Sequence, residues 1–478
     1  MPTFHKKGQQ CLILSLIKNK IVLTKEPTLK IQIHPGPKGG LFGLKFLGEI
    51  KENPLKFYKA LHQNFGETVS YRIGPVKIFQ LINPDDLHEI LVEKQKYFHK
   101  TKPVLRVLSK WNGNGLLLNS GDSWAKQRRL INPSFKKESV ESYISIVVNQ
   151  VKSLFPDEKK NLNMGAKLNE LTFRVVAEAL FGQKANEVAP QFIQKVEILQ
   201  ELAMKEMTAP LPLPDWLPLP SKRKLRKAIS FIQQTVDRFI TECHLEGLKK
   251  KNFLTEMLMA KDGDEEDEFK RGMTDKQARD ESVNLLLGGN ETMGTALTWL
   301  CYLLAKHPEI QDKIYDEIIN TLGDRDFQKE DLPHLKLLSM SFKEALRLYP
   351  PVYLLSREPL RPIEIGEETI QPGHQIHIPL FVLHRSEKWF EDPDKFKPER
   401  FSEENIKKIK PNTYIPFGLG PRACIGERFA HMEALASMAT LLKKFKLTGV
   451  EEPELAAKVS LYPKGGLNLT LLPRNNNE

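Results

Sequence analysis

Cysteine is scarce in this chain. Its four cysteines, Cys11, Cys243, Cys301 and Cys424, stand far apart in the sequence. They show neither the density of a disulfide framework nor the paired spacing of a zinc site, which excludes the small disulfide-stapled secreted domains. We therefore expect a reducing compartment and predict a cytoplasmic protein.

A hydrophobic run long enough to cross a membrane is also lacking near the N-terminus. The apolar run Cys11 to Ile17 is far shorter than the roughly 20 residues that a spanning helix needs. Lysines flank it, so a secretory signal or a segment resting on a membrane surface remains an alternative, but no small-residue cleavage site follows. A surface extension or edge strand is favoured, and peripheral membrane contact stays open.

Aromatic residues are few, at 8%, and no nucleic-acid-binding motif accompanies the net charge of +11. We therefore expect no nucleic-acid partner. The positive balance favours an acidic protein partner or an anionic membrane instead. With 40% hydrophobic and 27% charged residues, the composition is that of an ordinary globular protein.

Strand-like patterns are limited to a few patches. Val69 to Ile73 and Val76 to Ile82 alternate around Gly74-Pro75, which predicts a hairpin, and Gln375 to Ile378 predicts another strand. Most of the remaining sequence has helical spacing. We therefore predict a mainly α fold with a minor β region.

One helix is predicted to be unusually long. Thr274 to Gln277 matches a capping box, and the helical pattern continues to about Lys306, before His307-Pro308. At 1.5 Å per residue such a helix is about 50 Å long, so it should be central to its domain. Polar residues interrupt its apolar second half midway, and buried polar groups need partners. This midpoint is therefore a candidate functional site.

Two other segments are predicted to be connections. Pro210 to Pro220 cannot form one helix, so we interpret it as a flexible lid connection between two amphipathic helices. The acidic run Asp262 to Glu268 is interpreted as a solvated loop before the long helix.

Cys424 lies in the segment Phe417 to Gly426, between glycines and just before a helical pattern from Glu427 to about Phe445. Glycines let a backbone fold tightly against a flat ligand, and a helix N-terminus favours a thiolate over a thiol. A thiolate ligand donates electron density to iron and promotes O–O cleavage. A bare Cys-x-Gly turn with an incidental buried cysteine is the alternative.

The whole segment resembles the haem-binding loop of the cytochrome P450 family. Six positions carry the resemblance: Phe417, Gly418, Gly420, Arg422, Cys424 and Gly426. The resemblance implies a helical prism around haem b, iron protoporphyrin IX, with a long central helix and with Cys424 as the protein's ligand to the iron. It extends from about Pro35 to about Leu472, so we predict a single catalytic domain over residues 35–478, preceded by an N-terminal extension over residues 1–34.

A second resemblance lies in an E-x-x-R pair, Glu344 and Arg347, which share one helix face. Taken alone, the pair would be a surface salt bridge. In the family such a pair joins an arginine of a later PERF segment, which is Arg400 here. The triad is implied to lock the scaffold behind the haem, and loss of one member would leave a buried charge unpaired.

On the long helix, Gly288 to Thr292 resembles the family's oxygen-activating motif. Glycine is implied to let the helix approach iron-bound oxygen, the hydroxyl of Thr292 to hydrogen-bond it, and Glu291 to relay protons from water. A satisfied threonine beside an exposed glutamate is the alternative. Gly288, Asn290 and Met293 depart from the family's commonest residues, which leaves the pocket's shape open.

By the same resemblance, Trp124 and Arg128 form a W-x-x-x-R pattern that binds haem propionates, together with Arg422 and, less securely, Arg357. Arginine suits this role because its fork can bind a carboxylate at two places. An aromatic core anchor and solvated arginines are the alternatives.

Four basic residues near this segment are expected on the face behind the haem. They are Lys126, Arg129, Lys136 and Lys137. Such a patch could steer an acidic ferredoxin, flavodoxin or reductase, although scattered surface lysines are an equal alternative.

The resemblance implies a haem-thiolate monooxygenase that inserts one atom of dioxygen into a lipophilic small molecule by hydroxylation or epoxidation. The intact pair Glu291 and Thr292 argues against the alternative, a non-hydroxylating isomerase, peroxygenase or sensor. No flavin or iron–sulfur domain is recognised, so electrons should come from a separate donor. We expect a monomer resembling soluble, bacterial members of the family, with a fatty acid, terpenoid or sterol as substrate.

Overall fold

The structure is a computed structural model. It describes residues 36–37, 39, 43–155, 160–182, 187–207, 209, 213–249, 252–260, 273–365 and 368–474. All of them belong to the unit Pro35–Glu478, one of two into which contacts divide the chain. The predicted extension over residues 1–34, the acidic run Asp262 to Glu268, and part of the Pro210 to Pro220 connection lie outside the described residues.

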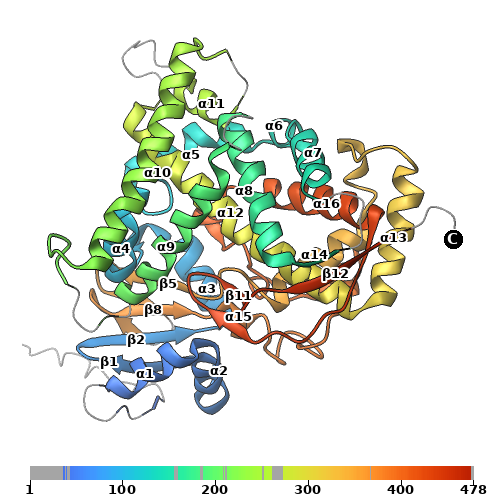
Figure 1. The fold of residues 1–478 in the computed structure, drawn as a ribbon. Coiled ribbons are helices and arrows are strands. Elements are labelled where there is room, and N and C mark those ends of the chain that lie inside the picture. Colours follow the sequence, from blue (N-terminus) through green and yellow to red (C-terminus); the bar gives the residue numbers. More distant parts are fainter. Residues whose placement is uncertain are drawn as a thin grey trace, which may run out of the picture. The chain divides into compact units, whose positions relative to one another are not determined.

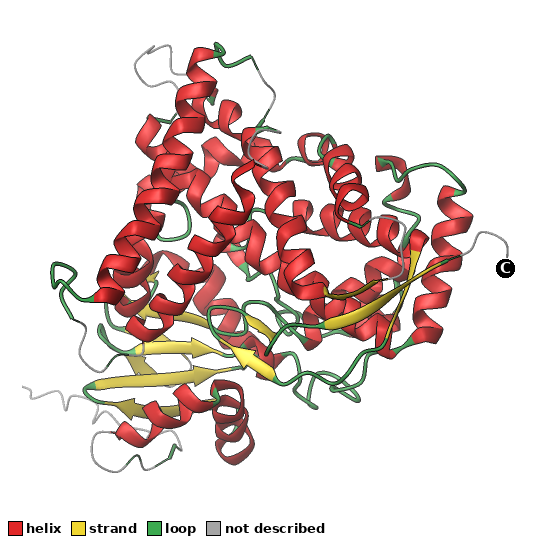
Figure 2. Cartoon of the chain, in the orientation of Figure 1, coloured by secondary structure: helices red, strands yellow, loops and turns green. Residues whose placement is uncertain are grey.

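Helices make up most of the described chain (Figure 2). The α-helices are α1 (Leu44–Glu52), α2 (Pro54–Phe65), α3 (Pro84–His88), α4 (Lys102–Asn112), α5 (Gly121–Ile131), α6 (Lys137–Glu141), α7 (Ile144–Leu154), α8 (Met164–Phe181), α9 (Ala189–Met207), α10 (Pro220–Leu245), α11 (Phe253–Met259), α12 (Asp275–Lys306), α13 (Pro308–Leu322), α14 (Lys336–Leu348), α15 (Leu380–Leu383) and α16 (Glu427–Lys444).

Twelve short strands form four small sheets in the described residues. The strands are β1 (Thr68–Ile73), β2 (Val76–Leu81), β3 (Phe98–His99), β4 (Lys160–Asn163), β5 (Leu355–Pro359), β6 (Ile363–Ile365), β7 (Glu368–Ile370), β8 (Gln375–Ile378), β9 (Phe445–Thr448), β10 (Leu455–Ala457), β11 (Leu461–Pro463) and β12 (Asn468–Pro473). The prediction of a mainly α fold with a minor β region is confirmed.

The largest sheet has the order β1-β2-β8-β5-β3. β1 and β2 form the predicted hairpin, with Ser70 paired to Phe79, and β8 joins β2 in parallel, with Ile376 beside Phe79. β5 pairs antiparallel with β8, and this places Arg357 opposite Ile376. α1 and α2 lie next to β1 (Figure 1). β5 therefore lies inside the sheet, between β8 and the short edge strand β3.

The long helix α12 begins and ends as the sequence predicts. The hydroxyl of Thr274 accepts a hydrogen bond from the backbone N–H of Gln277 at 3.3 Å, and the Gln277 side chain accepts from the Thr274 N–H at 3.0 Å. The helix ends at Lys306 because His307 leaves the helical conformation and Pro308 opens α13. Its 32 residues span about 48 Å.

α12 packs most extensively against α8, beside it in Figure 1. Gly294 makes this close approach possible, since a Cβ there would lie only 3.0 Å from the Cα of Asn169 on α8. Most of the helix is buried, including Trp299 and Tyr302. Burial on several sides explains why its hydrophobic pattern lacks a single apolar stripe.

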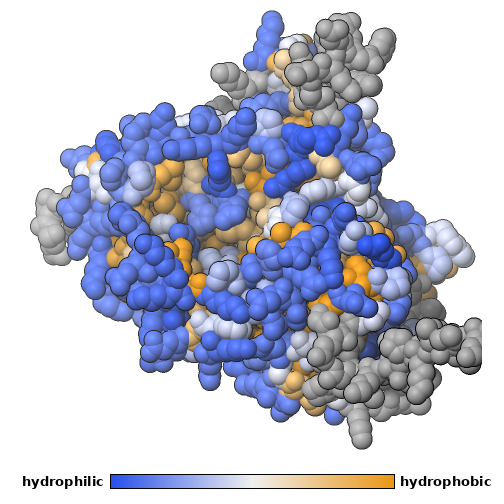
Figure 3. All heavy atoms as spheres, turned by 180° about the vertical axis from the view of Figure 1, so that it is seen from behind, coloured by the Kyte–Doolittle hydropathy of each residue, from blue (hydrophilic) through white to orange (hydrophobic). Residues whose placement is uncertain are grey.

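Most buried hydrophobic residues that the structure describes belong to two cores, and a third, small cluster includes Leu55, Tyr353 and Phe381. The larger lies among α7, α8, α12, α14 and α16, and the smaller lies between the five-stranded sheet, α2 and the segment after β8. None of the helices that the structure describes has both the length and the apolar character to cross a bilayer. The face in Figure 3 is largely hydrophilic, with hydrophobic residues gathered in patches between hydrophilic rims.

Candidate active site

A large cavity lies where α12, α8, α5 and the segment before α16 meet. It encloses about 1370 Å³, counting its opening to solvent. Its walls are mostly apolar. The lining residues include the predicted site residues Trp124, Arg128, Gly288, Gly289, Thr292, Arg357, Arg422, Cys424 and Gly426. Predicted site residues from four distant parts of the sequence therefore converge on one cavity.

A tight loop presents Cys424 to this cavity. The N–H of Cys424 donates to the carbonyl of Phe417 at 2.8 Å, which closes the loop just before α16 begins at Glu427. Gly420 has a φ of 71°, and a Cβ there would lie 2.3 Å from the carbonyl oxygen of Leu91. Only glycine therefore fits this turn. Phe417 and Gly418 shape the loop but are not among the lining residues.

The Cys424 side chain is accessible from the cavity, although protein surrounds it. Burial raises the pKa of its thiol, and this effect exceeds the opposing influences of the Gly426 N–H and of Arg128. The Gly426 N–H and Arg128 favour the thiolate as expected, and the thiolate at Cys424 stays a prediction. Desolvation outweighs the helix N-terminus, so the thiolate form requires a positive partner such as a metal ion.

Cationic side chains crowd one end of the cavity. Arg128 donates to the carbonyl of Ala423 at 3.0 Å, Arg422 donates to the carbonyl of Asn119 at 2.6 Å, and the Arg422 guanidinium stacks 4.0 Å from the ring centre of Trp124. Arg357 enters from β5. None of these three arginines forms an ion pair with a carboxylate in the part of the chain that the structure describes.

Burial and the nearby positive charges disfavour the charged forms of these side chains. Burial lowers the pKa of Arg357 and that of Arg422 to about 10, and Arg357 and Arg128 add to the effect on Arg422. Burial, with Arg357 and Arg422, lowers the pKa of Lys100 to about 7. Bound carboxylates would relieve the repulsion and restore the charges. The geometry therefore suits a ligand that carries negative groups at this end.

The opposite wall is the middle of α12, where two adjacent glycines differ in role. A Cβ on Gly289 would lie 2.8 Å from Cγ2 of Val176 on α8, so Gly289 permits helix packing. A Cβ on Gly288 would meet nothing within 4 Å, so Gly288 opens space in the cavity. Thr292 follows one turn later and donates its hydroxyl hydrogen to the Gly288 carbonyl at 2.5 Å. The oxygen of the Thr292 hydroxyl can therefore still accept a hydrogen bond.

Two motif residues point away from this wall. Asn290 accepts at its side-chain oxygen from the Thr172 hydroxyl of α8 at 3.1 Å, and the same hydroxyl lies 2.9 Å from the Asn290 carbonyl oxygen. Glu291 accepts from the Ser460 hydroxyl at 2.6 Å, and burial raises the pKa of its carboxyl. Neither residue is among the lining residues. Asn290 therefore affects helix packing rather than the pocket surface.

A haem fits the residues present. Cys424 offers a sulfur ligand from a loop that leaves open space beside it, where a Cβ on Gly426 would meet only Phe135 and Cys424 itself at 3.8 and 3.9 Å. Unpaired arginines match the two propionates of a haem. The apolar remainder of the cavity matches the apolar face of a macrocycle. Lys100 and His99 also line this end, yet no sequence motif marked them.

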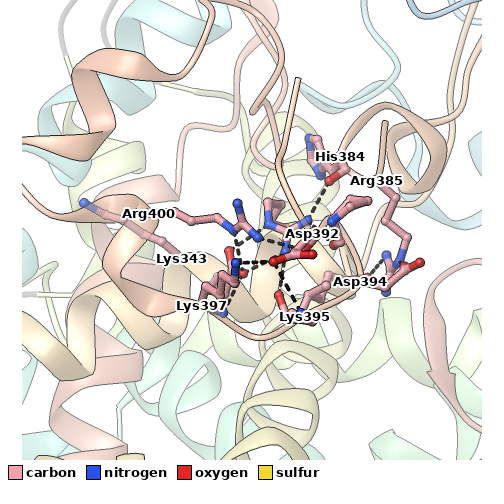
Figure 4. Close-up of polar contacts among 12 residues, drawn as sticks. Lys343, His384, Arg385, Asp392, Asp394, Lys395, Lys397 and Arg400 are labelled. Carbon is pink, nitrogen blue, oxygen red and sulfur yellow. Dashed lines mark hydrogen bonds and ion pairs between the residues drawn. The ribbon is translucent and has the colours of Figure 1, made fainter. Parts of the chain in front are cut away.

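Behind the Cys424 loop lies a buried charge network. Arg347 donates to both carboxylate oxygens of Glu344 at 2.7 Å, and Arg400 lies 3.3 Å from Glu344. The remaining Arg347 donors reach the carbonyls of His384, Pro393 and Lys395. Figure 4 shows Arg400 near Asp392, whose carbonyl it binds at 2.8 Å. The structure thus brings the predicted triad together in a well-satisfied network.

The four basic residues predicted as a docking patch lie on and around α5 and α6. Arg129, Lys136 and Lys137 are exposed, and Lys126 is partly buried. Lys137 forms an ion pair with Glu141 at 3.7 Å. The patch is therefore a surface feature close to the segment that carries Trp124 and Arg128.

Comparisons with known proteins agree with this geometry. The family model for cytochrome P450 matches residues 34–468. The chain is 28% identical to a cyclooctatin synthase of Streptomyces melanosporofaciens over 88% of this chain and 92% of the relative. It is 30% identical to cytochrome P450 4F6 of Rattus norvegicus, with 91% and 86% coverage. A Streptomyces melanosporofaciens cyclooctat-9-en-7-ol 5-monooxygenase is 28% identical, with 83% and 86% coverage.

Among solved structures, the haem domain of cytochrome P450DA superposes with a TM-score of 0.82 at 23% identity, covering 92% of this chain and 98% of that one. This likeness confirms the predicted fold. Relatives come from both bacteria and mammals, so the expectation of a bacterial-type member stays a prediction.

Proposed function

Because this chain belongs to the cytochrome P450 family, we propose that it inserts one oxygen atom of dioxygen into a lipophilic small molecule, by hydroxylation or epoxidation. The family assignment makes it a haem-thiolate monooxygenase, with haem as its cofactor. The observation that carries the proposal is the convergence of Cys424, the unpaired arginines and Thr292 on one cavity.

Four groups of this chain would hold the haem. Cys424 would bind the iron, while Arg128, Arg357 and Arg422 would bind the propionates, with Trp124 packed against Arg422. The bound haem supplies the redox chemistry of iron with dioxygen, which a thiolate ligand promotes. Binding of the propionates would also offset the burial that lowers the pKa of Arg357 and of Arg422, and the repulsion from Arg357 and Arg128 that adds to it at Arg422.

Proton supply is the role proposed for Thr292 and Glu291. The Thr292 hydroxyl lies on the cavity wall and can accept a hydrogen bond while it donates to the Gly288 carbonyl. The raised pKa of Glu291 favours a carboxyl that holds a proton and releases it to water. Glu291 faces Ser460 rather than the cavity, so water near Thr292 would complete the path.

The substrate is proposed to be lipophilic because the wall beside Gly288 is apolar. Leu116, Val176, Leu180 and Leu285 contribute to it. Relatives support this, since their names refer to cyclooctatin, cyclooctat-9-en-7-ol and leukotriene B4. Terpenoids, fatty acids and sterols remain the substrate classes to test.

Electrons are proposed to come from a separate ferredoxin, flavodoxin or reductase. The exposed basic residues on α5 and α6 support docking of an acidic protein there, because opposite charges steer association. We further propose that residues 35–478 act as one catalytic domain and that the protein is a cytoplasmic monomer. Three free cysteines in the described residues fit a reducing compartment.

The cofactor is tested by the spectrum of the reduced, carbon-monoxide-bound protein. A strongly red-shifted Soret band is expected for the native protein, and its loss is expected in Cys424→His. The activity is tested with isotope-labelled dioxygen and a reconstituted electron donor, which should place one labelled atom in the product. A normal spectrum without labelled product from any lipophilic compound would contradict monooxygenation.

Thr292→Ala separates the monooxygenase from its rivals. It should raise the electron use per product formed, because proton supply is impaired, while haem content stays normal. Thr295→Ala, on the same helix but outside the lining residues, is the matched control. Unchanged coupling in Thr292→Ala would favour an isomerase, peroxygenase or sensor.

A further inference from the structure

Large apolar side chains are exposed in the connection between α9 and α10. Within residues 213–219 of this connection, Trp216 is 76% exposed and Leu213 is 48% exposed. Pro214 and Pro218 are exposed as well. A single exposed leucine is ordinary, whereas a tryptophan that folding leaves in water among other apolar residues marks a surface of interaction.

Hydrogen bonds from two helices hold the residue that precedes Trp216. The Asp215 carboxylate accepts from Nζ of Lys110 on α4 at 2.8 Å and from Nζ of Lys222 on α10 at 2.6 Å. Arg226 of α10 donates to the Asp215 carbonyl at 2.8 Å. Trp216 is therefore exposed on an anchored segment, and the negative charge beside it is paired with two lysines.

Four exposed basic side chains follow in the first two turns of α10. They are Arg223, Lys224, Arg226 and Lys227. α10 has no acidic residue before Asp237. Since Arg226 binds the backbone next to Trp216, and since Arg223 and Lys227 share its helix face, the cations adjoin the exposed indole ring. This end of α10 is the one nearest α4 (Figure 1).

The surface of an anionic bilayer matches both features. Indole rings are favoured at the headgroup level of a membrane, where one part of the ring meets hydrocarbon and another meets water. Each lysine or arginine near anionic lipids strengthens binding by about fivefold. The paired carboxylate of Asp215 adds little repulsion, because two lysines neutralise it.

We propose that residues 213–219 and the first two turns of α10, residues 220–227, form a docking surface for an anionic lipid bilayer. The Trp216 ring lies at the headgroup level, and the cations of α10 face the lipid charges. None of the helices in the described ranges can span a bilayer, so the contact is peripheral. Membrane docking goes beyond the proposed oxygen insertion and does not depend on it.

Vesicle sedimentation tests the docking surface with the haem-loaded, full-length protein. The probes are vesicles of phosphatidylcholine with and without phosphatidylglycerol, and the amount of protein that sediments gives the dissociation constant. The native protein should bind the anionic vesicles at least about tenfold more tightly. Added salt should reduce this preference, because it screens the charges.

Trp216→Ser should weaken binding to anionic vesicles by at least about tenfold, since the apolar area of the ring is lost. Trp216→Tyr should retain most of the binding, because tyrosine also favours the headgroup level. Leu245→Ser is the matched control. Leu245 is 82% exposed at the opposite end of α10, about 37 Å along the axis from Pro220, so its loss should leave binding unchanged.

A charge variant tests the second half of the surface. Arg223→Gln combined with Lys227→Gln should weaken binding to anionic vesicles by about fivefold per charge and should leave binding to phosphatidylcholine unchanged. Lys407→Gln combined with Lys408→Gln removes the same charge from exposed residues of another segment. This control should keep most of the native preference.

Three outcomes would overturn the proposal: no binding to anionic vesicles, equal binding to both kinds of vesicle, or native binding by Trp216→Ser. Sedimentation velocity without vesicles tests a different occupant. Self-association of the native protein that Trp216→Ser abolishes would assign the surface to a second copy of the chain and would also overturn membrane docking. Loss of the haem-thiolate spectrum in the native protein would instead contradict the proposed function, and vesicle binding would be unaffected.

Discussion

The two sides of the Cys424 loop treat buried polar groups in opposite ways. Behind the loop, Glu344 and Arg347 are fully buried, and both carboxylate oxygens and every Arg347 donor nitrogen have partners at 2.6–3.2 Å. Across the cavity, Glu281 is just as buried, yet one of its oxygens has none in the described chain. Two equally buried carboxylates therefore differ in whether both of their oxygens are hydrogen-bonded.

The difference separates scaffold from function. A fully satisfied buried network is strongly destabilised when one member is removed, because the others lose their partners. Removing a buried group that has no hydrogen-bond partner costs little stability. A ligand that supplies the missing partner gains binding free energy. We therefore expect substitutions behind the loop to affect stability and substitutions in the α12 wall to affect ligand preference.

The largest effect is expected for Glu344→Gln. It would leave Arg347 and Arg400 buried without their counter-charge, so the free energy of unfolding should fall by about 3–5 kcal/mol. Urea denaturation of the haem-loaded protein, followed by tryptophan fluorescence, measures this loss. Glu403→Gln, whose exposed carboxylate pairs with Lys336 at 3.0 Å, is the control. A loss below about 1 kcal/mol in Glu344→Gln would undo the contrast.

The opposite sign is expected for Glu281→Gln. The folded-state pKa of Glu281, about 7, lies above its ordinary value, so burial destabilises the ionised form. This carboxyl's favourable contribution is complete at low pH and is lost as pH rises through about 7. The variant should therefore gain up to about 3 kcal/mol over the native protein at pH 8 and almost nothing near pH 4.5. Equal differences at both pH values would contradict this.

Smaller effects should distinguish the paired glycines. Gly289→Ala places a Cβ 2.8 Å from Val176, so it should cost about 1–2 kcal/mol despite better helix propensity. Gly288→Ala has free space and should gain up to about 1 kcal/mol, while it weakens binding of the bulkiest ligands. Thermal denaturation and spin-state titration measure the two effects. Equal changes in stability would mean that the two positions do not differ in packing.

The smallest effect is expected for Ser460→Ala. The Ser460 hydroxyl lowers the pKa of Glu291, so its removal should raise that pKa further and shift the alkaline limb of the turnover profile to higher pH. Stability should fall by only about 1 kcal/mol. Lys458→Ala removes a weaker influence on the same carboxyl and should shift the profile less. An unshifted profile in Ser460→Ala would argue against a proton path through Glu291.

Local signals predicted much of the fold and part of the site. Thr274 and Gln277 predicted the start of α12, and Gly74-Pro75 predicted the β1–β2 hairpin, because caps and turns depend on neighbouring residues. The loop around Cys424 could be predicted because its tight backbone turn requires glycine at particular positions. Lys100 carried no such signal, since its low pKa arises first from burial and then from Arg357 and Arg422, which are distant in sequence.

The amino-acid sequence alone determined the long capped helix, the cysteine loop and the family, since each depends on residues close together in the chain or on a contiguous motif. Tertiary structure alone decided that Asn290 faces α8, that Glu291 faces Ser460, and that one buried oxygen of Glu281 has no hydrogen-bond partner in the described residues. The direction in which a helix residue's side chain points, and how deeply it is buried, depend on the elements that pack around the helix. The pKa of Cys424 follows the same rule, because desolvation is a property of the assembled site.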